Sequence, residues 1–145
     1  MKPIIIHELE SFYLRHPELK GVPASLNQIK NAEEILHTKF NQDYICFLTH
    51  FGGSYAGCAI HGFLNAPNVG KETVIELTEQ ARNLSHLQNL FPELDKCIVI
   101  SDDGAGNPIA IDSKGEVWMF DFDTTKKNKI ADSLEKLIEG NIPTW

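Results

Sequence analysis

Residues 41–53 read Asn-Gln-Asp-Tyr-Ile-Cys-Phe-Leu-Thr-His-Phe-Gly-Gly. Asparagine is favoured just before a helix, because its side-chain oxygen accepts a backbone N–H of the first turn. Apolar residues then follow at the i, i+3, i+4 and i+7 spacing that lines one helix face: Tyr44, Phe47, Leu48 and Phe51. A glycine pair is typical of a helix end. The stretch therefore predicts an amphipathic helix, capped by Asn41, whose apolar face covers a core.

The same periodicity predicts further helices on both sides of this segment. Upstream, Ser25 and Gln28 form a capping-box pattern at the start of a helix over about 26–38. An earlier helix is predicted to end before Pro17, a long helix to span about 72–90, and a last helix to close the chain. The apolar residues behind these three predictions are Ile5, Leu9 and Phe12 for the first, Val74, Leu77, Ala81, Leu84 and Leu87 for the long one, and Ile130, Leu134, Leu137 and Ile138 for the last.

Between the last two helices the apolar period changes to two, which is typical of strands. Runs over 96–101, 107–112 and 116–123 are separated by turn-forming residues and predict three consecutive antiparallel strands. Residues 55–63 are expected to add another strand. Three aromatic side chains of the third run share one face, which we expect to lie under helices: Trp118, Phe120 and Phe122.

Helices, then a strand meander, then a closing helix indicate an α+β fold, with helices packed on a mainly antiparallel sheet. The chain has 145 residues, of which 42% are hydrophobic. A chain of this length buries about 70% of its unfolded surface without help from a metal or a disulfide. No linker divides it, so residues 1–145 are expected to form a single domain.

Composition and patterning favour a cytoplasmic protein. The longest apolar run near the start is 4–6, far short of the ~20 residues needed to span a bilayer. No secretory signal pattern is present. The cysteines Cys46, Cys58 and Cys97 are odd in number and widely spaced, which argues against a disulfide framework. We therefore expect a reducing compartment and no membrane partner.

The chain carries a net charge of -7, and most of it lies in one segment. Residues 92–125 contain eight acidic residues against Lys96 and Lys114, a net charge of -6. Such a segment can attract a basic protein and speed its association, or it can simply keep the protein soluble. The charge pattern alone leaves both interpretations open. The eight acids are Glu93, Asp95, Asp102, Asp103, Asp112, Glu116, Asp121 and Asp123.

Nucleic-acid binding and catalysis find little support in the residues. Nucleic acid requires a basic surface, and the only basic run is Lys126, Lys127 and Lys129, which we interpret as the solvated entrance of the last helix. No nucleophile elbow and no cysteine–histidine signature of an enzyme occurs. Asp102 and Asp103 are adjacent at a strand end, so their carboxylates are expected to point to opposite sides. The residues favour a protein that is not an enzyme.

Two patterns invite a metal- or phosphate-binding interpretation. Cys46, His50, Cys58 and His61 supply the ligand set of a zinc site, but small buried core residues explain both cysteines better. Residues 102–107, Asp-Asp-Gly-Ala-Gly-Asn, begin with two negative charges and lack the lysine of a phosphate-binding loop. They favour a tight turn between strands. We expect no metal and no cofactor.

Eight segments, in their order and spacing, carry a family resemblance. They are 32–36, 40–48 with 51–53, 60–63, 72–78 with 81–82, 99–107, 111–112, 115–118 and 131–137. Together they resemble the SUKH superfamily, which includes Smi/Knr-type proteins and YobK-like bacterial proteins, over about residues 25–139. Two features depart from the family pattern. Asn41 stands where proline is usual, and the last helix has Leu134 and Leu137 where an aromatic residue is usual.

The resemblance implies the α+β fold of the superfamily and a binding function. Because bacterial members are known mainly as immunity proteins, it implies a protein that stoichiometrically neutralises a cognate polymorphic toxin, often a nuclease. The toxin domain is then expected to be basic, since its surface must attract nucleic acid. The alternative is a regulatory or scaffolding module of the Smi/Knr type, acting in cell-wall or signalling control. Candidate toxin contacts are Asp102, Asp103, Asp112, Glu116, Asp121 and Asp123, with Ser54 and Tyr55 at the rim.

Overall fold

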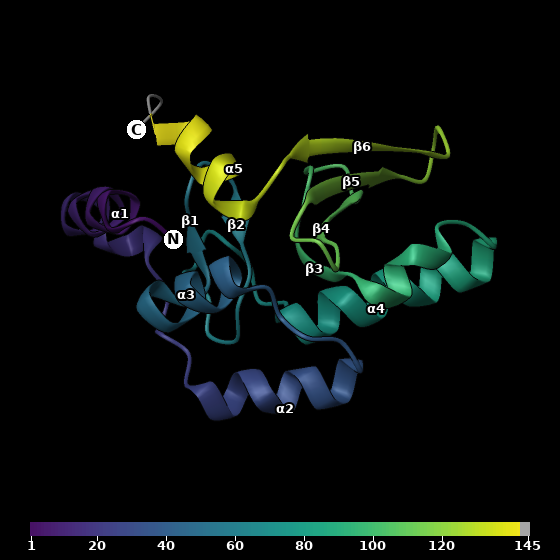
Figure 1. The fold of residues 1–145 in the computed structure, drawn as a ribbon, viewed down its shortest axis with the longest axis horizontal. Helices are drawn as coiled ribbons and strands as arrows, with labels where there is room; N and C mark the ends of the chain where they lie inside the picture. Colours follow the sequence, from purple (N-terminus) through teal and green to yellow (C-terminus); the bar gives the residue numbers. More distant parts are fainter. Residues whose placement is uncertain (143–145) are drawn as a thin grey trace.

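The computed structural model describes residues 1–142 and has the α+β fold expected from the sequence (Figure 1). Within these residues no helix has the length and apolar character needed to cross a membrane. The elements are α1 (Pro3–Arg15), η1 (Pro17–Leu19), α2 (Leu26–Leu36), α3 (Gln42–Phe51), β1 (Ser54–Tyr55), β2 (Ala59–Ile60), α4 (Val74–Gln88), η2 (Pro92–Lys96), β3 (Ile98–Asp102), β4 (Pro108–Ile111), β5 (Val117–Asp121), β6 (Lys126–Ala131) and α5 (Leu134–Asn141).

Helix α3 is the predicted central helix. The Asn41 side chain accepts the Asp43 backbone N–H at 3.0 Å, as an N-cap does. All four residues of the predicted apolar face are buried. The helix ends at Gly52, whose φ of +71° suits glycine. A Cβ at Gly52 would lie 1.9 Å from the Val22 carbonyl oxygen, so the chain can pass this close only without a side chain.

Helix α4 is correctly predicted as an element, but its buried face differs from the prediction. Leu87, assigned to the apolar face, is 84% exposed. The inward positions include the polar residues Thr78 and Ser85. The Thr78 hydroxyl accepts the Val99 backbone N–H at 3.0 Å, and the Ser85 hydroxyl donates to the Phe91 carbonyl at 2.9 Å. Because both hydroxyls are hydrogen-bonded, their burial costs little free energy of folding.

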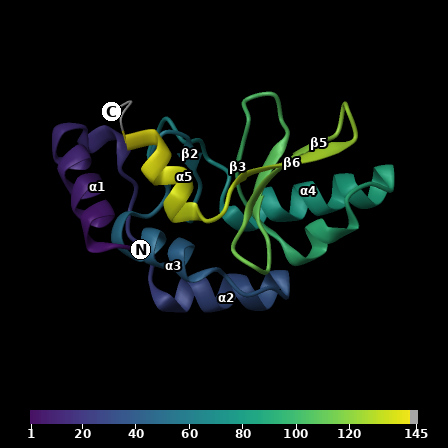
Figure 2. The same cartoon turned by 45° about the horizontal axis from the view of Figure 1, so that its top comes forward.

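Strands β3 to β6 form an antiparallel sheet in chain order, with apolar residues on both faces. One face packs under α4 (Figure 2) and η2. Phe120 is buried there and Trp118 and Phe122 are partly buried, so the predicted aromatic face is confirmed. The opposite face joins the larger core with α1, α2, α3 and α5 through Ile100 and Val117, among others. The sheet therefore contributes side chains to both apolar clusters.

Strand β6 corrects the prediction for the end of the chain. Ile130, predicted in the last helix, lies in β6 and is 40% exposed. The basic run Lys126, Lys127 and Lys129 is likewise on this strand and not at a helix entrance. Helix α5 begins only at Leu134. The predicted strand over 55–63 is also wrong in detail, because two short paired strands, β1 and β2, replace it.

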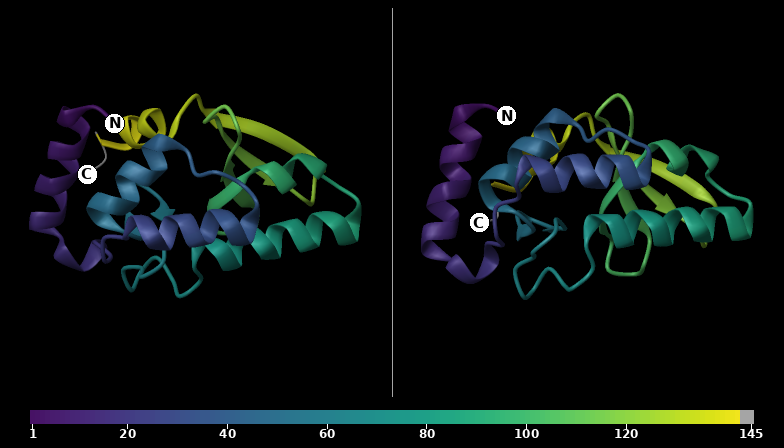
Figure 3. Two further views of the ribbon diagram at one scale, coloured as in Figure 1. Left: turned by 60° about the horizontal axis from the view of Figure 1, so that its bottom comes forward. Right: turned by 90° about the horizontal axis from the view of Figure 1, so that it is seen from below.

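Helix α1 covers one end of the larger core. Figure 3 places it at the end of the molecule opposite the C-terminus of α4. Its buried side chains include Leu9 and Tyr13. The Tyr13 ring lies 5.1 Å from that of Phe51, and its hydroxyl donates to the Tyr55 carbonyl at 2.9 Å. Helix α1 is thus joined to both α3 and β1.

Replacing Phe47 by alanine tests the core assignment of α3. Phe47 is fully buried, and truncating such a residue costs about 3–5 kcal/mol of unfolding free energy. The matched control is Leu87→Ala, at an exposed position, which is expected to stay within about 0.5 kcal/mol of the parent. Urea unfolding followed by circular dichroism measures both. Equal stability of the two variants would contradict the burial of Phe47.

Candidate functional site

The β3–β4 loop is a tight turn organised by its own carboxylates, as predicted for residues 102–107. The Asp103 carboxylate accepts hydrogen bonds from the Ala105 N–H (2.8 Å), the Asn107 N–H (3.1 Å) and the Asn107 side-chain amide (2.9 Å). The Asn107 side chain is the main cause, and the backbone N–H groups a further cause, of a lowered pKa for Asp103. The Asp102 carboxylate accepts the Gly104 N–H at 2.7 Å.

The β5–β6 turn carries two further carboxylates and lies beside this loop. Asp121 accepts the backbone N–H groups of Asp123 (2.9 Å) and Thr124 (3.1 Å). The Asn107 side-chain oxygen accepts the Phe122 N–H at 3.3 Å, which ties one turn to the other. Four candidate contact residues therefore gather at one end of the sheet. We call this surface the acidic tip: Asp102, Asp103, Asp121 and Asp123.

Asp112 and Glu116 lie at the opposite end, because successive turns of an antiparallel meander alternate between the two ends. The Asp112 carboxylate accepts the N–H groups of Lys114 (2.9 Å) and Glu116 (2.9 Å), and the Trp118 indole N–H (3.0 Å). The Glu116 carboxylate forms an ion pair with Lys129 at 3.2 Å. These two carboxylates stabilise the β4–β5 turn and its strand neighbours, and they are not part of the acidic tip.

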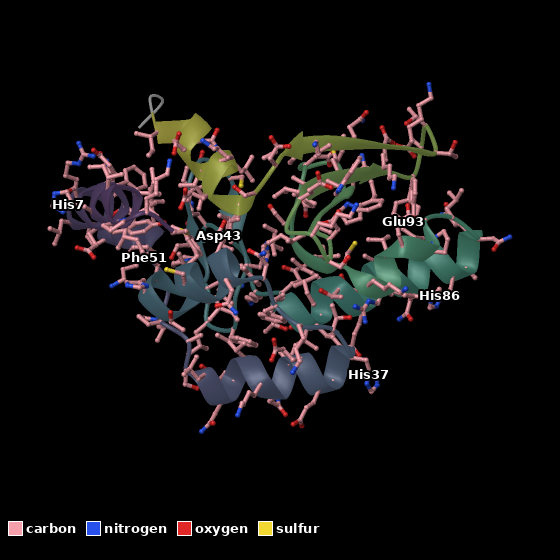
Figure 4. The ribbon with its side chains drawn as sticks, viewed as in Figure 1. His7, His37, Asp43, Phe51, His86 and Glu93 are labelled. Carbon is pink, nitrogen blue, oxygen red and sulfur yellow. The ribbon has the colours of Figure 1, made fainter. Side chains whose placement is uncertain are left out.

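The lysines of β6 neutralise part of the acidic segment. Lys127 lies 3.6 Å from the Glu93 carboxylate and 4.8 Å from the centre of the Trp118 ring; Figure 4 shows Glu93 between α4 and the sheet. Lys129 contacts Asp132 at 2.8 Å in addition to Glu116. The net charge of -6 counted along residues 92–125 therefore overstates the charge of the folded surface. The four tip carboxylates form no ion pair with residues 1–142, although Lys126 is the cross-strand partner of Asp121.

Ser54 and Tyr55, the predicted rim residues, lie in the other half of the molecule, away from the β5–β6 turn (Figures 1 and 2). Ser54 has no exposed surface. Its hydroxyl accepts the Gly21 N–H at 2.9 Å and donates to the Phe51 carbonyl at 3.0 Å. Tyr55 is half-buried. The structure does not bring either residue to the acidic tip, and the Ser54 hydroxyl is occupied within the fold.

Of the four residues considered for zinc, Cys46 and His50 lie together, with 3.7 Å between Sγ and Nδ1, and both histidine rings contact backbone carbonyls. His50 Nδ1 lies 2.8 Å from the Cys46 carbonyl oxygen, and His61 Nδ1 lies 2.6 Å from the Glu72 carbonyl oxygen. Burial raises the pKa of the Cys58 thiol to about 11. Over residues 1–142, no three His, Cys, Asp or Glu side chains are grouped as metal ligands.

Two residues near the acidic tip were missed in the sequence. No role of its own within the 102–107 turn is predicted for Asn107 from the sequence, although an asparagine that ends a glycine-rich turn is a good candidate for a turn-stabilising side chain. Glu72 lies 30 positions before Asp102 in sequence, yet both line one groove beside α4. No local pattern connects them, because only the packing of α4 on β3 brings them together.

Comparison with known protein families gives a match that covers most of the chain. The family model described as SMI1 / KNR4 family (SUKH-1) matches residues 23–140. A search of curated proteins finds no match. The matched region starts after α1 and η1 and includes every strand, the acidic tip and the groove residues.

Replacing Asn107 by alanine tests how the turn holds Asp103. Loss of the side-chain hydrogen bond is expected to raise the pKa of Asp103 toward its ordinary value, because the charged carboxylate loses its main partner. A pKa below the ordinary aspartate value of about 3.9 stabilises the folded state at pH values above about 3.9. This stabilisation is lost as the pH falls through the pKa of Asp103 in the folded state. Carboxyl NMR titration measures the shift. Asn68→Ala, at an exposed position, is the control, and an unchanged Asp103 pKa in Asn107→Ala would refute this assignment.

Proposed function

The chain belongs to the SMI1 / KNR4 family (SUKH-1), and on that premise we propose that it is a bacterial immunity protein. It binds a cognate polymorphic toxin and neutralises it in a stoichiometric complex. The toxin class that fits best is a nuclease with a basic substrate-binding face. Family membership supports the general class of interaction domain, and the charge of the acidic tip supports the nature of the partner.

The observation that carries the proposal is the unpaired charge of the acidic tip. None of its four carboxylates forms an ion pair with any residue in 1–142. By contrast, Glu93, Glu116 and Asp132 elsewhere on the sheet side are paired with lysines. Charges left without internal partners in a folded protein produce a field that extends into solvent. A basic partner is attracted to this end of the sheet first.

Inhibition requires no chemical step in this arrangement. A nuclease must present lysine and arginine side chains to phosphate groups. The acidic tip binds the same side chains, and the protein behind it excludes nucleic acid from the toxin surface. Complementary charge raises the association rate and selects the partner. The turn hydrogen bonds of Asp103 and Asp121 hold the backbone of the tip in place before the toxin arrives.

Reversing two tip charges tests the proposal. Asp102→Lys combined with Asp123→Lys is expected to slow association with the toxin domain encoded beside this gene by at least about tenfold at low salt. Asp103 and Asp121 stay unchanged, because each carboxylate accepts at least two turn hydrogen bonds, whereas Asp102 accepts one. Glu10→Lys combined with Glu34→Lys makes the same change in net charge at exposed sites on α1 and α2 and is expected to leave association nearly unchanged. Stopped-flow binding at several salt concentrations gives the rates.

Survival of cells that express the toxin provides the functional measurement. The tip variant should protect poorly while its unfolding free energy stays within about 1 kcal/mol of the parent, since the changed side chains are exposed. A folded tip variant that protects as well as the parent would show that the toxin binds elsewhere. If the parent chain does not bind the toxin domain at all, the immunity proposal fails, and the Smi/Knr-type regulatory function takes its place.

A further inference from the structure

A groove lies between the first half of α4 and the end of β3. The groove holds about 250 Å³, less than the roughly 300–1,000 Å³ of pockets that enclose a whole small molecule. Its lining includes the apolar residues Leu77 and Leu84 of α4, Val99 of β3 and Pro108 of β4, together with the polar residues Gln80 and Ser101. Figure 3 shows the β3–β4 loop extending beside α4 at this place. The dimensions suit one inserted side chain.

Two carboxylates, from Glu72 and Asp102, line the same groove. Both residues are exposed, and neither forms an ion pair with the residues that the structure describes. No lysine, arginine or histidine lines the groove. Apolar walls with acidic groups at the opening form an environment that attracts a cation carried on an apolar stem.

Hydrogen bonds fix the backbone of Glu72 and the side chain of Asp102. The Glu72 carbonyl accepts hydrogen bonds from the Asn65 side-chain amide at 2.8 Å and from His61 Nδ1 at 2.6 Å. Asp102 accepts the Gly104 N–H at 2.7 Å, which fixes the rotation of its side chain. A site whose groups are already ordered loses less entropy on binding. The Asp102 side of the groove is therefore ordered before a ligand binds.

We propose that the groove binds one lysine or arginine side chain of the partner protein. The inference rests on the proposed function in taking the partner to be a basic protein. Lysine and arginine have apolar stems that pack on hydrophobic walls and charged ends that remain at the surface. The stem packs against Leu77, Leu84 and Val99, and the charged end donates hydrogen bonds to Glu72 and Asp102. The acidic tip attracts the partner, and the groove supplies the specific anchor.

Small amino-acid probes test the groove without the toxin. N-acetyl-lysine methylamide and N-acetyl-arginine methylamide are titrated into the full chain, and backbone amide NMR signals are followed. Saturable shifts are expected at the groove residues Leu77, Leu84 and Gly106. N-acetyl-norleucine methylamide, which has the lysine stem without its charge, is expected to bind at least about fivefold more weakly.

A double neutralisation identifies the groups that bind the charge. Glu72→Gln with Asp102→Asn keeps the side-chain shapes and is expected to weaken the two cationic probes by about fivefold. Glu10→Gln with Glu34→Gln removes the same charge at distant exposed sites and is expected to leave binding unchanged. If the cationic probes give no saturable shifts at the groove, or if norleucine binds as tightly, the inference is overturned. An unaffected double variant overturns it as well.

The toxin measurement separates this inference from the proposed function. When the parent chain binds the toxin domain, Glu72→Gln, which leaves the acidic tip unchanged, should weaken that complex by about fivefold. An unchanged complex overturns the groove inference and leaves the immunity proposal intact. If the parent chain binds no toxin, the immunity proposal fails, and the probe titration still decides whether the groove selects a cationic side chain.

Discussion

The guanidinium of Arg82 holds α4 against the rest of the fold. It donates to the carbonyl oxygens of Leu36 (2.7 Å), Leu94 (3.1 Å) and Cys97 (3.0 Å), and to the Thr38 hydroxyl (3.0 Å). These acceptors belong to the end of α2, to η2 and to the start of β3. Carbonyls at a helix end have no partner within the helix, and burial lowers the pKa of Arg82 while leaving it charged. Together with the apolar contacts of α4 and the Thr78–Val99 hydrogen bond, this side chain sets where the groove and the acidic tip lie relative to the helices, and its planar set of donors is one that lysine does not provide.

The sequence predicts an element well where local chemistry determines it. Helix α3 has its cap, its apolar face and its terminal glycine within thirteen residues, so it needs no tertiary information. Strand β6, by contrast, is not determined by its local sequence. Lys126–Ala131 lacks apolar alternation, and its strand conformation follows from pairing with β5. Edge strands often carry lysine, which discourages pairing with other chains. From sequence alone, the lysines of β6 are therefore also compatible with the solvated start of a helix, and only the pairing with β5 identifies a strand.

The candidate site was predictable in composition but not in arrangement. The acids at strand ends were identified from the sequence, and the meander already implied that Asp112 and Glu116 face away from Asp102. The pairing of β6 beside β5 was missed, so three neighbouring lysines were left out of the charge count. Glu72 could not be assigned from sequence, since its proximity to Asp102 follows from helix packing across the chain. A charge count along the sequence therefore predicts the sign of a surface charge better than it predicts where on the folded protein that charge lies.

Helix α1 has a practical consequence for work on related domains. The family match begins at residue 23, yet Leu9 and Tyr13 lie in the same core as the matched helices. A fragment expressed from residue 23 would lose the ring that packs on Phe51 and the hydroxyl that binds the Tyr55 carbonyl. Exposed aromatic surface of this kind promotes aggregation. The boundary for recombinant expression is thus set by the packing of the core and lies upstream of the boundary drawn from sequence similarity.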